Sequence, residues 1–180
     1  MRKTAFNVAF GGIVSALCLV LEFSVGFLPI FLYVFPMICS ILMYILYTEC
    51  GLKTSLCAYV GVSVLSLFMC PDKEAAMMFV MFFGYYPILR VYIQKIKPKA
   101  LKMLFKFAVF NVAMVLAYLI IIFVFGITET DMMGELSWFW ILLLAVGNVV
   151  FAMFDILLDR LLYIYEKRLR HKLFGHGKRR

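Results

Sequence analysis

The chain has 180 residues, of which 66% are hydrophobic and 16% charged, and its net charge is +8. This apolar fraction is far above the roughly 45–50% of soluble domains and excludes an ordinary water-soluble enzyme or binding domain. The five cysteines are odd in number and form no CxxC pair, so they favour neither a zinc site nor a disulfide framework. We therefore expect an integral membrane protein without a cofactor.

Apolar runs of about 20 residues recur along the whole chain. Each is long enough to cross a hydrocarbon core of roughly 30 Å as a helix, and none alternates as barrel strands do. The predicted fold class is all-α, with a six-helix transmembrane domain over 1–165 and a basic cytoplasmic tail over 166–180. The expected helices are 5–26, 29–47, 53–70, 75–94, 103–127 and 137–162.

The basic residues predict the orientation of these helices. Of the 18 Lys and Arg residues, only Lys73 falls in the loops on the side opposite the termini. The positive-inside rule then places both termini in the cytoplasm, in a multi-pass plasma-membrane protein. The basic segment 95–106 and the tail fit an anionic lipid surface better than nucleic acid, because leucines placed among basic residues are typical of an interfacial helix.

Few charged side chains lie inside the expected spans, where they are costly and therefore informative. Arg90 and Asp155 lie at similar depths, roughly 10 Å cytoplasmic of the midplane at 1.5 Å per residue. We predict a structural ion pair between them, with Asp159 nearby. The alternative is an ion relay of Arg90, Asp155 and Asp159 in a small stand-alone secondary transporter.

Glu22 lies on the opposite, external half of the first expected helix. An acid at that depth is either a group at the external mouth or half of a pair, and Lys73 is the only external cation. We predict a functional role for Glu22.

The stretch FGYYPILR, residues 83–90, interrupts the fourth expected helix. Pro87 has no N–H to offer the carbonyl of Phe83, and Gly84 is adjacent, so a kink is expected here. The stretch is interpreted as a bend that ends in an interfacial anchor.

The first expected helix carries small residues at i, i+4, i+7 and i+11, a pattern that allows close approach of another helix. Two interpretations stay open: packing within the bundle, or docking of a partner subunit. We name these four residues the small-residue stripe: Ala5, Ala9, Gly12 and Ala16.

The sequence lacks the motifs GxxxxGK[ST], GxSxG and HExxH, so no catalytic residues are predicted and the chain is not expected to be an enzyme. The pair Asp155 and Asp159 in DILLD resembles the end of the motif of membrane CDP-alcohol phosphotransferases, but the earlier elements of that motif are missing.

The chain length, six expected helices with cytoplasmic ends, and the start RKTAFNVAFGGIVSALCLVLE (residues 2–22) together resemble the S components of energy-coupling-factor (ECF) vitamin transporters. The chain is also similar to uncharacterised Firmicutes membrane proteins with PDKEA and FGYYPILR-like stretches. The competing class is a membrane scaffold of the six-helix rod-shape type, without a ligand pocket.

The ECF resemblance implies a function and a set of partners. It implies a subunit that captures a micronutrient and works with a transmembrane T component and two ATPase subunits. It implies that the small-residue stripe docks to the T component. It also implies an external substrate pocket that draws on four residues: Glu22, Lys73, Trp138 and Asn148.

Overall fold

A computed structural model describes residues 2–125 and 137–169. They fall into two compact units, Met1–Glu135 and Leu136–Arg180, and each is described by itself. Every regular element in the described ranges is a helix, which confirms the all-α class for this part of the chain.

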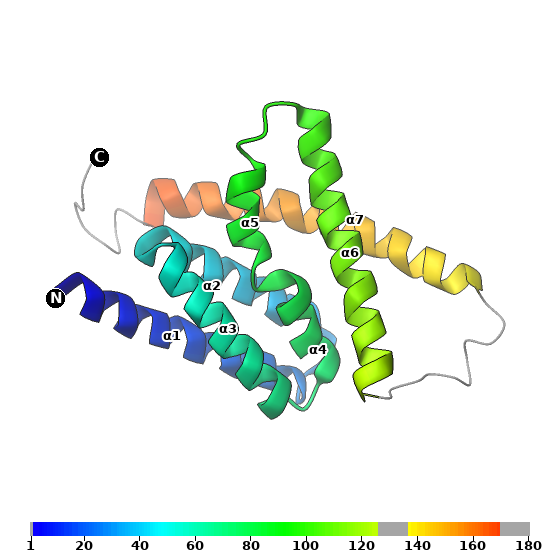
Figure 1. Ribbon diagram of the computed structural model, residues 1–180, viewed down its shortest axis with the longest axis horizontal. Helices are drawn as coiled ribbons and strands as arrows, with labels where there is room; N and C mark the ends of the chain where they lie inside the picture. Colours follow the sequence, from blue (N-terminus) through cyan, green and yellow to red (C-terminus); the bar gives the residue numbers. More distant parts are fainter. Residues whose placement is uncertain (1, 126–136, 170–180) are drawn as a thin grey trace. The chain divides into compact units, whose positions relative to one another are not determined.

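The first unit holds eight elements, and Figure 1 labels its α-helices. Its bounds are α1 (Arg2–Val25), η1 (Pro29–Phe31), α2 (Val34–Cys50), α3 (Leu52–Met69), α4 (Lys73–Met78), η2 (Phe79–Phe83), α5 (Tyr86–Ile93) and α6 (Lys99–Phe125). The second unit holds α7 (Ser137–Ile164) and η3 (Tyr165–Leu169).

Four stretches within the described residues are long and apolar enough to cross a membrane. The helix α2 is apolar but shorter. These segments support a membrane protein, while the six spans and the cytoplasmic location of the termini stay predictions. The four stretches are Thr4–Val25, Leu52–Met69, Lys73–Ile93 and Lys99–Ala117.

The helix boundaries follow local sequence signals. Gly51 separates α2 from α3 at φ 84°, a left-handed conformation that glycine adopts without steric cost, and its N–H donates to the Tyr47 carbonyl at 2.9 Å. Asp72 caps α4, because its carboxylate accepts from the N–H groups of Glu74 at 2.9 Å and Ala75 at 3.1 Å. The second helix begins at Val34 rather than at residue 29, since Pro29–Phe31 forms a separate 3-10 turn.

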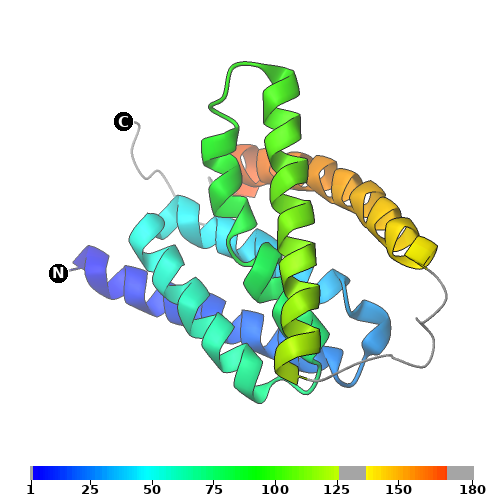
Figure 2. The same cartoon turned by 45° about the vertical axis from the view of Figure 1, so that its right-hand side comes forward.

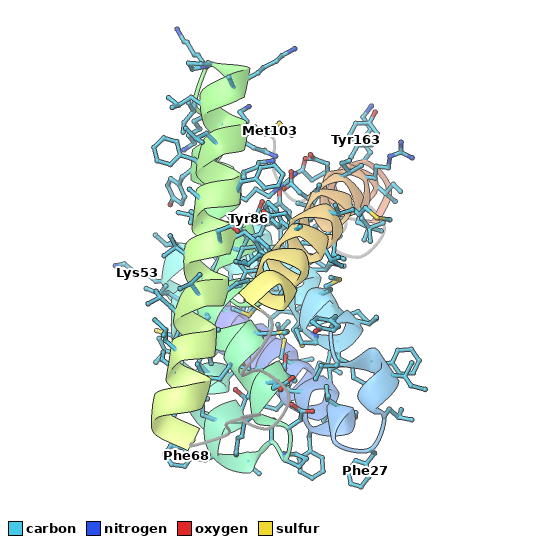
Figure 3. All side chains as sticks on the ribbon, turned by 90° about the vertical axis from the view of Figure 1, so that its right-hand side faces the viewer. Phe27, Lys53, Phe68, Tyr86, Met103 and Tyr163 are labelled. Carbon is cyan, nitrogen blue, oxygen red and sulfur yellow. The ribbon has the colours of Figure 1, made fainter. Side chains whose placement is uncertain are left out.

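The centre of the first unit is formed by α2 and the broken span α4–η2–α5. Helix α1 packs against α2 and α3, whereas α6 packs against α4, η2 and α5 (Figure 2). The broken span is 61% buried, against 22–28% for the other three candidate spans. Tyr86, labelled in Figure 3, is fully buried in this centre.

The predicted bend at FGYYPILR lies where the span is broken. Phe79–Phe83 forms a π-helical turn in which the Gly84 N–H donates to the Phe79 carbonyl at 2.8 Å, and α5 then starts with Pro87 in its first turn. The break thus begins one turn before the proline. The Tyr59 hydroxyl on α3 donates to the Val80 carbonyl at 2.6 Å, so the π-turn is fastened to the neighbouring helix.

Candidate functional site

Glu22 is buried in the last turns of α1. Its exposed fraction is 0%, and neither carboxyl oxygen has a hydrogen-bond partner among the described residues. A buried ionised carboxylate without a partner is strongly unfavourable in a low-dielectric interior. This group is therefore the most conspicuous unsatisfied polar side chain in the first unit.

The groups around Glu22 come from separate elements of the first unit. The Cys39 thiol on α2 interacts with the Glu22 carboxyl, although its hydrogen bond is directed at the Cys18 carbonyl, 3.7 Å away. Asp72, just before α4, and Cys70, just after α3, also interact electrostatically with Glu22. We call Glu22, Cys39, Cys70 and Asp72 the Glu22 cluster.

Cys70 lies between two candidate spans and is 1% exposed. Burial raises the pKa of its thiol to about 11; Glu22 and Asp72 act in the same direction, and Lys73 opposes them. The Cys70 side chain is therefore a neutral thiol at neutral pH.

Lys73 is bound to the end of α3. Its ammonium group donates to the carbonyls of Leu67 at 2.8 Å and Cys70 at 2.9 Å, which satisfies acceptors at a helix C-terminus. Of the two interpretations of Glu22, the pair with Lys73 is not formed, because Glu22 accepts from no described donor. Lys73 is near the cluster but does not neutralise its acid.

Exposed aromatic side chains surround the end of the unit where the cluster lies. Phe27 follows α1 and Phe68 is in the last turn of α3, and Figure 3 shows both projecting at the same end of the first unit. Gly26 lies so close to the Pro71 ring that an added Cβ would overlap it. The chain after α1 is thus packed directly on the α3–α4 connection.

The other two predicted substrate residues belong to the second unit. The Asn148 amide donates to the Leu144 carbonyl of its own helix at 2.7 Å. The side chain of Trp138 lies outside the described side chains, and the connection expected between the helices 103–127 and 137–162 lies outside the described residues. The structure thus brings Glu22 and Lys73 into one region, while a pocket shared with Trp138 and Asn148 stays a prediction.

The small-residue stripe is on the exposed face of α1. Ala5, Ala9, Gly12 and Ala16 are all exposed, and a Cβ added at Gly12 would meet nothing within 4 Å. The stripe therefore does not pack against the described residues of its own unit, and the choice between packing in the whole bundle and docking of a partner stays a prediction.

A different face of α1 makes the internal contacts, and sequence analysis missed it. Asn7 donates to the Cys50 carbonyl at 3.4 Å, a Cβ at Gly11 would lie 3.2 Å from Thr54, and Val14 and Cys18 are buried. These positions follow the stripe by two residues each, about 200° around a helix of 3.6 residues per turn. The packed face and the small-residue stripe are thus opposite each other.

The predicted ion pair joins two residues of different units. Arg90 is 2% exposed on α5, Asp155 is half-buried on α7, and Asp159 is exposed. Their pairing stays a prediction. A shallow, open depression on α7 is lined by Asp159, Arg160, Tyr163 and Ile164.

Among the described residues, no group of three His, Cys, Asp or Glu side chains is placed to hold a metal ion. Comparisons with family models, curated proteins and solved structures find no match to this chain.

Proposed function

We propose that this chain is the membrane-embedded, non-enzymatic substrate-capture subunit of an ECF-type micronutrient transporter in the plasma membrane. Its partners are a transmembrane T component and two ATPase subunits in other chains. Both termini are cytoplasmic, and no nucleic acid is involved.

The observation that carries this proposal is the exposed small-residue stripe on α1. Apolar helices in lipid gain little from hydrophobic burial against each other, so association depends on close packing across small residues. Here the stripe is left open while the opposite face of α1 packs internally. That arrangement suits a helix with two packing faces, one for its own unit and one for a partner.

The substrate side of the proposal rests on the resemblance and on the Glu22 end of the first unit. Glu22, Lys73, Trp138 and Asn148 are the proposed ligand-contacting residues. The acidic groups near this end, Asp72 and Glu74, argue against a strongly anionic substrate.

The test compares leucine substitutions at two glycines that both have open space around them. A Cβ at Gly12 on α1 or at Gly61 on α3 meets nothing within 4 Å, so leucine fits either position in the isolated unit. Tagged wild type, Gly12→Leu and Gly61→Leu would be purified in mild detergent from native membranes, with associated chains and small molecules identified by mass spectrometry.

We expect wild type and Gly61→Leu to retain a membrane subunit with two ATPases, and Gly12→Leu to lose them while keeping any bound metabolite. Equal recovery from all three would remove the docking role of the stripe. Recovery of envelope-assembly proteins without an ATPase or metabolite would favour the scaffold class.

The stand-alone secondary transporter is tested separately. Asp155→Asn would abolish uptake in that class, because the ion relay needs an ionisable group there. Unchanged uptake by Asp155→Asn would exclude the relay.

A further inference from the structure

The Glu22 carboxyl has no compensating cation in the part of the chain that the structure describes. Its oxygens accept no hydrogen bond, and the ammonium of Lys73, which acts on Cys70, donates to the Leu67 and Cys70 carbonyls instead. An ionised carboxylate here would be an uncompensated buried charge, which the carboxyl group of Asp72 disfavours further.

The elements that pack on α1 bring few titratable groups to Glu22. Helix α2 supplies the Cys39 thiol, the end of α3 supplies the Cys70 thiol, and the start of α4 supplies Asp72; Lys73, the next residue, acts on Cys70. The turn η1 has the sequence PIF and carries no titratable side chain. The surroundings of Glu22 are thus two thiols, one acid and an ammonium group that is already bound.

These surroundings determine whether the Glu22 carboxyl can bind a metal cation or a proton. A hard cation such as Na⁺ or Ca²⁺ needs several oxygen ligands; the two thiols provide none, and the Asp72 carboxylate already caps α4. No group of three metal-ligating side chains is assembled among the described residues. A proton needs neither a shell of oxygens nor additional volume, and it removes the charge at its source.

We propose that Glu22 is a buried proton-binding site, with its carboxyl protonated at neutral pH while α1, α2 and the α3–α4 connection are packed around it. Release of the proton requires that this end of the unit opens to water or that a cationic group reaches the carboxyl. The inference is independent of the proposed transport role, since it concerns the isolated chain.

The experiment is infrared spectroscopy of the purified full chain. Wild type should show a carbonyl-stretching band of a protonated carboxyl group at neutral pH, sensitive to exchange into D₂O. Glu22→Gln should lose this band completely, whereas Glu74→Gln, which changes an exposed acid, should keep it.

A wild-type spectrum with only ionised carboxylates at neutral pH would overturn the proposal, and so would a band that persists in Glu22→Gln. If Glu22→Gln does not accumulate as folded protein, dicyclohexylcarbodiimide labelling of wild type tests whether Glu22 is protonated. This apolar reagent modifies protonated carboxyls. An adduct on Glu22 at neutral pH that disappears at alkaline pH supports the site. No adduct on Glu22 overturns it.

Discussion

The broken span around Gly84 and the Glu22 cluster both place polar atoms inside the first unit. They differ in whether these atoms have hydrogen-bond partners. At the broken span the Tyr59 hydroxyl donates to the Val80 carbonyl and the Gly84 N–H donates to the Phe79 carbonyl. At the cluster, both oxygens of Glu22 lack a described partner. An interruption whose polar groups are paired is explained by packing alone, whereas an unpaired buried acid calls for something that binds it.

The largest effect is expected at Gly84. Gly84→Ala would place its Cβ 2.5 Å from the Tyr59 ring and 3.0 Å from the Phe79 carbonyl oxygen, so the ring and its hydrogen bond must shift. Overpacking of this kind costs about 1–3 kcal/mol of unfolding free energy. Denaturant unfolding in detergent measures this loss of unfolding free energy.

Gly61→Ala is the control for this substitution, because its Cβ enters open space on an exposed helix face. Alanine there should be neutral or stabilise the helix by about 0.5–1 kcal/mol. Equal stability of Gly84→Ala and Gly61→Ala would show that the close packing at Gly84 is not maintained.

A smaller loss is expected for Tyr59→Phe. The change keeps the ring against Phe79 and Tyr85 but removes the donor to the Val80 carbonyl. The loss of one such hydrogen bond costs about 1 kcal/mol, measured in the same unfolding assay. Tyr33→Phe, at a half-exposed tyrosine before α2, should change stability less. If the two variants are equally stable, the π-turn does not depend on Tyr59.

The smallest effect is expected for Glu22→Gln at neutral pH. Glutamine is uncharged like a protonated glutamate and nearly the same shape, so the unfolding free energy should fall by less than the about 1 kcal/mol expected for Tyr59→Phe. A loss of several kcal/mol would mean that the negative charge of Glu22 is needed.

The stabilities of wild type and Glu22→Gln should diverge as the pH rises. If the folded state holds the Glu22 proton more tightly than the unfolded chain, raising the pH removes stability from wild type and leaves Glu22→Gln unaffected. Melting temperatures measured from mildly acidic to alkaline pH would show this divergence. Parallel curves for the two proteins would contradict it.

The sequence was sufficient for several features of the fold. Long apolar runs predict apolar helices because hydrophobic length and backbone hydrogen bonding leave few other structures in lipid. In the described residues, four of these helical stretches are long and apolar enough to cross a membrane. The bend at FGYYPILR was also predictable, since a missing N–H at Pro87 is a local property. The π-turn was not, because an inserted residue in the helix depends on what Tyr59 offers from another helix.

The amino-acid sequence by itself determined that this chain forms apolar helices, where one of them breaks, and that an acid lies within the first. Only the tertiary structure decided which face of α1 packs internally, because Gly12 and Gly11 lie on rows with the same helical spacing and only contact with Thr54 distinguishes them. It also decided that the Glu22 carboxyl is buried and interacts with two thiols and another acid. Those neighbours come from α2 and the α3–α4 connection, and the chain must fold before they meet.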